Sequence, residues 1–440
     1  RPARFPKRAG NRRLMRILHV TAGAANMYCG SCMRDNALAA ELKRQGHDVV
    51  LMPVYTPTLT DEENVSDGRV FFGGISVYLQ QKSTFFRYTP AFLDRLLFDN
   101  SWTLRKASQK SIGVTPQFLG EMTVDMLRGE GGPIAKEFRK VADWLRGEPA
   151  FDVICLPFTL LISMAEPLRR ASPGARIVCT LQGEDLFLEG LPEPYRRESK
   201  RLIQAAVPQV DLFLAVSGYY ASFMGDYLNI PKEKMRVVPI GISMDGYEAV
   251  AKPRRDVVKI GFFARIDPAK GLHHLCEAYR LLRRKPGLPP LRLEAAGYML
   301  PEHQAYLEKQ QSALGAAGLA GEFTYHGALS REEKTRFLQD INLLCVPTEY
   351  VEPKGLFVLE ALANGTPVVL PAHGAFPEIL ARTGGGILVQ PRDAQELADS
   401  LENMICDADR RVELAAQGAA GVREFYSAAA MAKAQLAAFV

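Results

Sequence analysis

Short apolar runs alternate with amphipathic helical patterns along most of the chain, and this alternation constrains the fold more than any other feature. A buried strand followed by a helix is typical of a parallel sheet covered by helices on both faces. The runs form two series, separated by a polar stretch at residues 246–256. The first series comprises Arg16–Thr21, Asp48–Pro53, Val153–Pro157, Arg176–Leu181, Leu212–Val216 and Met235–Pro239. The second comprises Lys259–Phe263, Leu291–Ala295, Phe323–His326, Leu343–Pro347, Val368–Leu370 and Gly386–Val389.

Two such series in 440 residues predict an α/β protein with two doubly wound, Rossmann-like domains facing each other across a cleft. We expect an N-terminal domain over residues 15–245, a C-terminal domain over 246–425, and a helix at 426–440 that could pack back on the N-terminal domain. Residues 80–150 interrupt the rhythm, which predicts a helical insertion. Its aromatic stretch Phe85–Tyr88 either packs within that subdomain or forms an acceptor-binding lid. Ligand is expected in the cleft, at the carboxyl ends of the strands.

The formal charge of +5 comes from a basic leader. Residues 1–14 hold six basic and no acidic side chains, which leaves 48 basic against 49 acidic residues and argues against a nucleic-acid partner. We expect a solvated tail, with docking on anionic lipid as the alternative. Seven scattered cysteines do not form a disulfide framework, and no run reaches the ~20 apolar residues of a spanning helix. The expected location is the cytoplasm, with the inner face of the membrane as an option.

The segment Val351–Val369 carries the most chemical information. Glu352 lies in the loop after the strand that ends at Pro347, and Glu360 lies on the first turns of the next helix. Two carboxylates at this spacing can reach successive parts of one elongated polar ligand. Backbone N–H groups at a helix N-terminus favour a phosphate or sugar oxygen. Here they belong to Gly355, Leu356 and Phe357.

This segment resembles the signature of the retaining glycosyltransferases of family 4, which have the GT-B fold. The resemblance implies that Glu352 contacts hydroxyl groups of the donor sugar and that Glu360 binds the ribose diol. Lys354 stands where the family usually has phenylalanine, a departure that concerns sugar specificity more than the fold. Shorter matches extend the resemblance over most of the chain, and among them His326 and Gly327 are implied as walls of the base pocket.

A second loop holds two cations five residues apart, Arg265 and Lys270. Taken alone, Arg265 and Lys270 would be interpreted as solvent-exposed loop charges without a function. The family places its diphosphate-binding arginine and lysine at this spacing, which favours a functional role. Fixed positive charges aimed at the departing diphosphate stabilise the negative charge that develops as the glycosidic bond breaks.

The first domain contributes further candidates. Gly30 matches the second glycine of a pair that lets the backbone approach the donor phosphate. Gln182 stands where the family usually has a histidine facing the donor sugar, and we expect its amide to bond to a sugar hydroxyl group. The alternative is that Gln182 only caps a loop while Glu184 or Asp185 contacts the substrate on the acceptor side.

Cys29 and Cys32 form a C-x-x-C pair at the predicted start of a helix. We expect structural or substrate-contacting thiols, with redox chemistry as the alternative. A zinc site is disfavoured, because no second Cys or His pair at metal-ligand spacing accompanies them. His273 and His274 are expected at the surface of the helix that follows the diphosphate loop, and they have no partner motif. No metal and no cofactor is therefore expected.

The resemblance implies a retaining hexosyltransferase that moves a sugar from a UDP- or GDP-sugar to a hydroxyl group of a glycan, lipid or small molecule. No dedicated protein base is required, and Arg265 and Lys270 replace a divalent cation. An epimerase or glycan phosphorylase of the same architecture stays open, although no pyridoxal phosphate lysine pattern supports the phosphorylase. Two alternatives from other classes also remain open. One is a nucleotide-sugar-binding protein without turnover, and the other is a thiol-disulfide protein built on Cys29 and Cys32.

Overall fold

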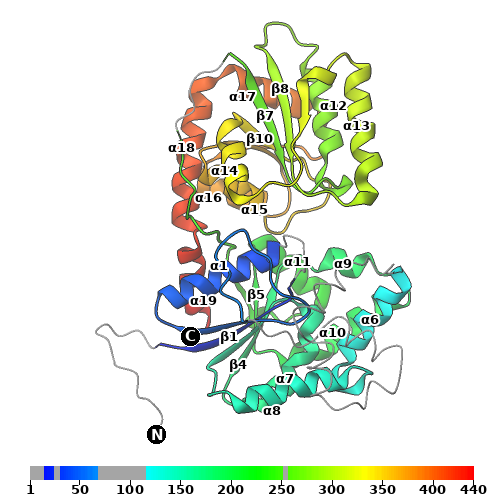
Figure 1. Cartoon of the computed structure of the whole chain (residues 1–440), viewed down its shortest axis with the longest axis vertical. Coiled ribbons are helices and arrows are strands. Elements are labelled where there is room, and N and C mark those ends of the chain that lie inside the picture. The colour runs from blue at the N-terminus through cyan, green and yellow to red at the C-terminus, as the bar shows by residue number, and fades with distance from the viewer. Residues whose placement is uncertain (1–13, 24–29, 68–114, 251–255) are drawn as a thin grey trace.

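The computed structural model describes residues 14–23, 30–67, 115–250 and 256–440. Two α/β domains are stacked along the long axis of the molecule, the N-terminal domain below and the C-terminal domain above (Figure 1). Each is built on a six-stranded sheet in which every paired strand is parallel to its neighbour. The predicted pair of doubly wound, Rossmann-like domains is confirmed.

The N-terminal sheet has the strand order β2-β1-β3-β4-β5-β6. Its strands are β1 (Arg16–Thr21), β2 (Asp48–Pro53), β3 (Val153–Leu156), β4 (Arg176–Leu181), β5 (Leu212–Ala215) and β6 (Met235–Val237). Its helices are α1 (Gly30–Arg44), α6 (Pro116–Arg128), α7 (Ala135–Gly147), α8 (Ala165–Ala171), α9 (Asp185–Glu189), α10 (Tyr195–Ala206) and α11 (Gly218–Leu228).

The C-terminal sheet has the order β12-β11-β10-β7-β8-β9. Its strands are β7 (Val258–Phe263), β8 (Leu291–Ala296), β9 (Phe323–Tyr325), β10 (Leu343–Cys345), β11 (Val368–Pro371) and β12 (Gly386–Val389). The helices that follow β7 are α12 (Leu272–Leu282), α13 (Gln304–Ala316), α14 (Arg331–Asp340), α15 (Leu356–Ala363), α16 (Phe376–Thr383), α17 (Ala394–Cys406), α18 (Ala408–Phe425) and α19 (Ala428–Ala438).

Both sheets reverse their winding direction at one point, between β1 and β3 in the first domain and between β7 and β10 in the second. Right-handed crossovers to either side of such a point place helices on opposite faces, so the loops at the carboxyl ends of the two central strands diverge. Ligands of open α/β sheets bind in the crevice that results. The loops after β7 and β10 carry Arg265, Lys270 and Glu352, so the fold places the predicted donor residues at this crevice.

The strands occur where the sequence predicts them, and the differences are confined to their ends. β3 ends one residue before Pro157, β6 ends at Val237 before Pro239, and β10 ends at Cys345 before Pro347. Pro157 has no N–H group to continue the ladder, which accounts for the end of β3 at Leu156. Every residue of β3, β5, β10 and β11 is buried, as expected for parallel strands covered on both faces.

The described part of the predicted insertion is helical. Thr115 caps α6, with its side chain accepting from the Phe118 N–H, and Pro116 occupies the first turn, where a missing donor is tolerated. In α7, Phe138 and Val141 join the main hydrophobic core. The aromatic stretch Phe85–Tyr88 lies outside the described residues, as does the basic leader up to residue 13.

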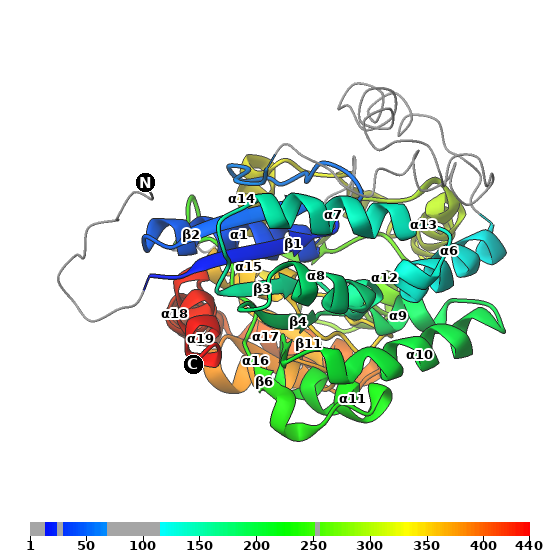
Figure 2. The same ribbon diagram turned by 90° about the horizontal axis from the view of Figure 1, so that it is seen from below.

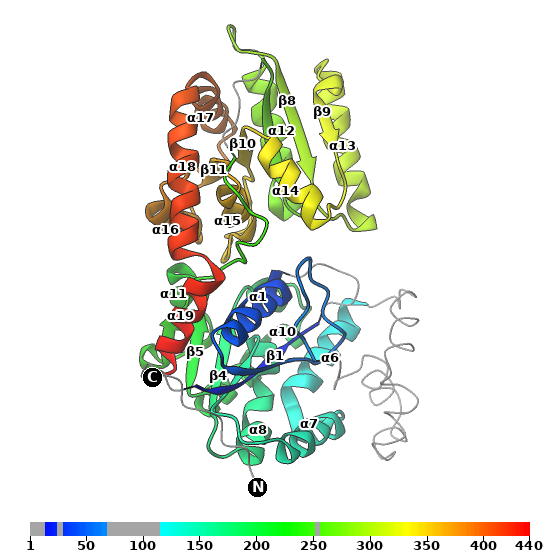
Figure 3. The ribbon, with the colours of Figure 1, turned by 60° about the vertical axis from the view of Figure 1, so that its left-hand side comes forward.

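The chain crosses between the domains twice, and the two crossings are hydrogen-bonded to each other. The Ile242 N–H donates to the Tyr426 carbonyl at 2.9 Å, and the Ala428 N–H donates to the Ile242 carbonyl at 2.7 Å. Helix α18, before the second crossing, lies against the C-terminal domain, and α19, after it, lies beside the N-terminal domain (Figure 3).

Helix α19 completes the N-terminal domain. Met431, Ala432 and Phe439 pack into a core with Leu38 of α1 and Val153 of β3. The Arg176 guanidinium donates to the Phe439 carbonyl at 2.7 Å. Figure 2 shows the red end of the chain at the same edge of the molecule as the start of β1. In the described part of the chain, no helix combines the length and the apolar character that crossing a bilayer requires.

Candidate functional site

The two predicted donor loops meet at the carboxyl ends of β7 and β10. Lys270 ends a short 3-10 turn after β7, and Glu352 lies in the loop between β10 and α15. Their side chains form an ion pair, with Lys270 Nζ 2.5 Å from Glu352 Oε2. The backbone joins the same loops, since the Glu349 N–H donates to the Ala269 carbonyl at 3.0 Å. The predicted cation and the predicted carboxylate therefore belong to one site.

Glu352 is a buried carboxylate with a side chain 6% exposed. Its Oε1 accepts from the backbone N–H groups of Lys354 at 3.2 Å and Gly355 at 3.3 Å. Burial acts to raise the pKa of Glu352, but the charge of Lys270 and these hydrogen bonds outweigh it, so the pKa lies below its usual value. The carboxylate is ionised at neutral pH and can accept hydrogen bonds from hydroxyl groups.

Two glycines allow the loops around this ion pair to pack closely. Gly271, with φ 77°, lies so near Pro347 that a Cβ atom would stand 1.8 Å from the Pro347 carbonyl oxygen. Gly374, with φ 61°, lies against Glu352, where a Cβ atom would stand 2.3 Å from the Glu352 carbonyl oxygen. Both residues adopt a left-handed conformation that suits glycine. The backbone that carries Glu352 is thereby held on two sides.

Arg265 lies at the open side of the same loop. Its side chain is about half exposed, and its Nη2 lies 3.0 Å from Asp267 Oδ2. The other oxygen of Asp267 accepts from the Ala269 N–H at 2.9 Å, which fixes the turn. The site thus has one partly buried cation, Lys270, and one exposed cation, Arg265, on a single rigid loop.

Glu360 projects from the second turn of α15 into a buried ionic contact. Its Oε1 accepts from Lys334 Nζ at 2.6 Å and from the Tyr247 hydroxyl at 3.2 Å. Burial alone would lower the pKa of Lys334, but the negative charges of Glu360 and Asp61 raise it above its usual value. Nothing in the sequence indicates that Lys334 is a partner of Glu360.

His326 and Gly327 directly follow β9. His326 Nε2 lies 2.7 Å from Glu294 Oε2, and its ring makes an edge contact with Phe337 at 5.6 Å between centroids. The Gly327 carbonyl accepts from the Gly297 N–H at 2.8 Å. An aromatic and backbone wall of this kind can flank a planar base.

The N-terminus of α1, in the N-terminal domain, lies close to that of α15, in the C-terminal domain; Figure 1 shows both helices where the two domains meet. Gly30 starts α1 and lies so close to Leu356, the first residue of α15, that a Cβ atom would stand 2.9 Å from its Cδ1. Lys354 Nζ donates to Ser31 Oγ at 3.2 Å. In the same helix start, the Phe357 ring lies 5.7 Å from Lys270 Nζ. Both helix dipoles and Lys354 direct positive potential into one space, where an anionic group is favoured.

The structure separates the three candidates that follow β4. Glu184 is buried: its Oε1 accepts from the Thr159 N–H and hydroxyl, both at 3.2 Å, and its Oε2 accepts from the Gln182 N–H at 2.8 Å and from the Tyr220 hydroxyl at 3.2 Å. These bonds use both oxygens within the N-terminal domain. Asp185 is only partly buried and accepts from the Tyr220 hydroxyl at 2.7 Å. Burial raises the pKa of Asp185, against the effects of Tyr220 and Lys354.

Gln182 is 2% exposed, and its amide Nε2 donates to the Pro157 carbonyl at 2.7 Å. Its Oε1 is buried and has no hydrogen-bond partner among the described residues. The neighbouring Gly183 lies against the opposite domain, near Pro353 and Lys354. The side chain is therefore anchored at the cleft rather than extended into it.

Several cross-domain contacts close the cleft, and their roles were not evident from the sequence. The Glu378 carboxylate accepts from the first N–H groups of α11, those of Gly218 at 2.9 Å and Tyr219 at 3.2 Å. The Ser217 hydroxyl donates to the Pro353 carbonyl at 2.9 Å. Arg331 Nη1 donates to Glu62 Oε1 at 3.0 Å.

Cys32 lies in the first turn of α1 and is 0% exposed. Cys29, its predicted partner, lies outside the described residues. His273 and His274, which were expected at a helix surface without a partner, are only partly exposed, and both contact Glu349.

Two family models match the chain. The model described as Glycosyltransferase Family 4 matches residues 122–245, and the model described as Glycosyl transferases group 1 matches residues 248–420. Together they cover most of the described parts of both domains, and the second includes both donor loops.

Curated relatives are similar over part of their length. A D-inositol 3-phosphate glycosyltransferase of Stackebrandtia nassauensis is 28% identical over 252 residues, which are 55% of this chain and 56% of the relative. A GDP-mannose-dependent alpha-(1-6)-phosphatidylinositol monomannoside mannosyltransferase of Mycobacterium tuberculosis is 23% identical over 282 residues, 61% of this chain and 69% of the relative. The chain thus spans between about half and about two thirds of the length of these relatives.

A solved structure supports the fold over nearly the whole chain. HepE of Anabaena, crystallised in complex with UDP, superposes with a TM-score of 0.65 over 96% of this chain and 98% of its own, at 17% identity. The shared architecture is GT-B, with two Rossmann-like domains facing across a cleft.

Proposed function

Because the chain belongs to family 4 of the glycosyltransferases, we propose that it transfers a hexosyl unit from a nucleoside diphosphate sugar to a hydroxyl acceptor, with retention of configuration. The observation that carries this proposal is the ion pair between Lys270 and Glu352 at the switch point of the second sheet. The Lys270 ammonium can bind an anionic leaving group, and the Glu352 carboxylate beside it can bind a sugar hydroxyl group.

The diphosphate binds to Arg265 and Lys270 in this proposal. The Arg265 side chain is about half exposed and Lys270 is held close to Glu352, so the loop offers one accessible cation beside one that is fixed at the carboxylate. The two charges oppose the negative charge that develops on the departing oxygen, which is the role that a divalent cation plays in other transferases. Transfer is therefore expected to need no metal ion.

The donor sugar lies between Glu352 and the α15 N-terminus, and the ribose lies at Glu360. Glu352 is ionised, and its present partners Lys270, Lys354 and Gly355 leave Oε2 able to accept one further hydrogen bond, from a sugar hydroxyl group. Glu360 keeps one carboxylate oxygen for the ribose diol while Lys334 and Tyr247 contact the other. The base lies beside His326 and Gly327.

The acceptor hydroxyl group approaches from the N-terminal domain. Asp185 is favoured over Glu184 as its contact, because both oxygens of Glu184 are already bonded within that domain. The bond from the anomeric carbon to the diphosphate oxygen breaks, and the acceptor oxygen bonds to that carbon on the same face. The departing diphosphate oxygen takes the acceptor proton, so no protein base is needed.

A UDP-sugar and a GDP-sugar are both supported as donors. The Anabaena structure contains UDP, whereas the Mycobacterium tuberculosis relative is named for GDP-mannose. Relatives named for inositol phosphate and phosphatidylinositol acceptors support a polyol acceptor.

The decisive experiment incubates the purified chain with UDP-, GDP- and ADP-sugars, with and without polyol acceptors and in the presence of a chelator. We expect release of one nucleoside diphosphate, and a product whose anomeric configuration, read by NMR, equals that of the donor. The Glu352→Ala variant should lose this release, and Cys29→Ser should keep it. Inversion of configuration would contradict retention, and tight nucleotide binding without release would contradict transfer.

A further inference from the structure

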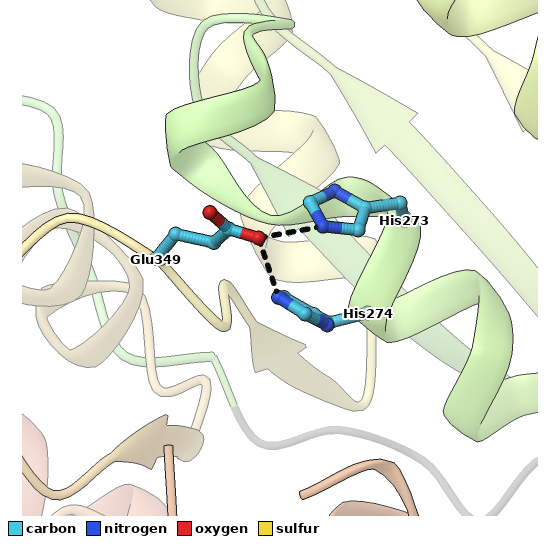
Figure 4. Close-up of side chains that lie close together, drawn as sticks. All are labelled: His273, His274 and Glu349. Carbon is cyan, nitrogen blue, oxygen red and sulfur yellow. Dashed lines mark hydrogen bonds and ion pairs between the residues drawn. The ribbon is translucent and has the colours of Figure 1, made fainter. Parts of the chain in front are cut away.

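Three side chains with metal-ligand chemistry converge outside the proposed donor site: His273, His274 and Glu349 (Figure 4). The Nε2 atoms of His273 and His274 lie 2.9 and 3.0 Å from the same carboxylate oxygen, Glu349 Oε1. The potential ligand atoms of all three residues lie within 4.8 Å of one another. Two imidazole nitrogens and one carboxylate oxygen are a donor set that zinc commonly uses.

The backbone fixes both elements that supply these side chains. His273 and His274 lie on the first turn of α12, and their rings face Glu349 from the helix side, with centroids 4.1 Å apart. Glu349 lies in the loop after β10, where its own N–H bonds to the Ala269 carbonyl at 3.0 Å. The three ligands therefore come from two segments that are already held together.

The observed separations are close to those of a metal centre. Tetrahedral zinc has Zn–N and Zn–O distances of about 2.0–2.2 Å, so neighbouring ligand atoms lie roughly 3.3 Å apart. The nitrogen–oxygen distances of 2.9 and 3.0 Å need to widen by only a few tenths of an ångström. All three side chains are partly exposed, which leaves solvent access for an ion and for a water ligand.

Tyr306 supports one of the two imidazoles. Its hydroxyl oxygen lies 2.8 Å from His273 Nδ1 and accepts from the His273 backbone N–H at 3.1 Å. A partner on the second ring nitrogen orients a metal-binding histidine and leaves the first nitrogen for the ion.

We propose that His273, His274 and Glu349 form a site for one divalent transition metal ion, best matched by Zn²⁺. The bound ion fastens the start of α12 to the loop that leads to Glu352. Lys270 lies two residues before the start of α12, and Glu352 follows Glu349 by three, so the ion joins the two segments that carry the donor-site ion pair. The ion itself takes no part in sugar transfer.

The test uses the full chain, freed of metal with a chelator and then dialysed. Titration with Co²⁺ and Zn²⁺ should show one saturable site per chain, with the strong visible absorption of four-coordinate cobalt. His274→Gln and Glu349→Gln should each weaken binding by about 100-fold or more, and Tyr306→Phe by about 10- to 100-fold. Zinc at one hundred times its Kd should raise the wild-type Tm by about 5–10 °C. The shift should vanish in Glu349→Gln.

Cys406→Ser is the matched control, because Cys406 is an exposed thiol of the described chain that could bind zinc on its own. Unchanged cobalt and zinc binding in this variant supports the proposal. Circular dichroism verifies the fold of each variant, and His273→Gln replaces any variant that fails to fold. Equally tight binding by Glu349→Gln, absence of saturable binding, or a sulfur-to-cobalt charge-transfer band would overturn the proposal.

Discussion

Lys334 of the C-terminal domain donates a hydrogen bond to Asp61 of the N-terminal domain, with its Nζ 2.6 Å from Asp61 Oδ2. The same Nζ lies 2.6 Å from Glu360 Oε1, so one ammonium group joins the cross-domain contact to the carboxylate proposed to bind ribose. The side chains of Lys334 and Asp61 are both buried, where salt screens a charge pair weakly. We therefore expect nucleotide binding and domain closure to be linked through Lys334.

Asp61→Asn should weaken this closure while leaving Glu360 paired with Lys334. We expect a larger radius of gyration in solution scattering without nucleotide, and a KM for the donor raised by about tenfold, because a hydrogen bond to a charged group contributes ~1.5–3 kcal/mol. Asp399→Asn is the control, since Asp399 pairs with Lys285 within the C-terminal domain. An Asp61→Asn variant with the wild-type radius and KM would show that the contact does not hold the domains together.

Removal of either loop cation should impair the chemical step. Arg265→Ala and Lys270→Ala should each lower kcat by about 10²–10³-fold, the usual loss when one preorganised stabiliser of a developing charge is removed. Steady-state kinetics with the best donor measures this. Arg283→Ala is a control, because Arg283 pairs with Glu322 at the far end of α12. Wild-type rates in both loop variants would refute the assignment of the diphosphate site.

Acid should reveal the contribution of Lys270 to stability. The pKa of Glu352 in the fold lies below its ordinary value of 4.5, so the ionised pair stabilises the fold fully above about pH 4.5. That stabilisation disappears as the pH falls through the lowered pKa. Lys270→Met should therefore reduce the Tm at neutral pH, and the difference from wild type should shrink on acidification. A difference that stays constant at every pH below 4.5 down to acid unfolding would contradict this linkage.

Gln182→Ala should lower kcat/KM, because it removes both the amide bond to the Pro157 carbonyl and the Oε1 atom, which has no hydrogen-bond partner among the described residues. The wild-type rate should show no titration near pH 6.5, where an unperturbed histidine changes its charge. In Gln182→His such a titration should appear in the pH profile of kcat/KM. Full activity of Gln182→Ala would move the sugar-facing role to Asp185.

Thiol labelling should follow burial. We expect a small alkylating reagent to modify Cys406 of the native protein rapidly and to leave Cys32 unmodified, since Cys32 is inaccessible in the first turn of α1. Peptide mass spectrometry before and after denaturation measures both sites. Rapid modification of Cys32 under native conditions would support the redox alternative.

The sequence predicts the sheets well because parallel strands covered on both faces are continuous apolar runs, such as Leu212–Ala215. It also places Glu352 and Lys270 at strand-to-loop junctions, which is a local property. The pairing of these two side chains follows from the adjacency of β7 and β10, and the chain order does not reveal that adjacency.

Other features depend on contacts between distant segments. Asp61 and Lys334 are 273 residues apart, and neither belongs to a motif. The sequence could not separate Glu184 from Asp185, because the difference lies in how Thr159 and Tyr220 fold around them. Glu349 likewise meets His273 and His274 only because a backbone bond to Ala269 holds its loop beside α12.

The return of the chain at Tyr426 affects the order in which the protein can assemble during synthesis. The ribosome makes β1 and α1 before the C-terminal domain, yet the apolar face that includes Leu38 stays uncovered until Met431 and Phe439 have left the exit tunnel. By then the whole C-terminal domain has been made. Of the two domains, the one that is synthesised earlier is thus completed later, and a chaperone that shields apolar surface would have a binding site there while the C-terminal domain is made.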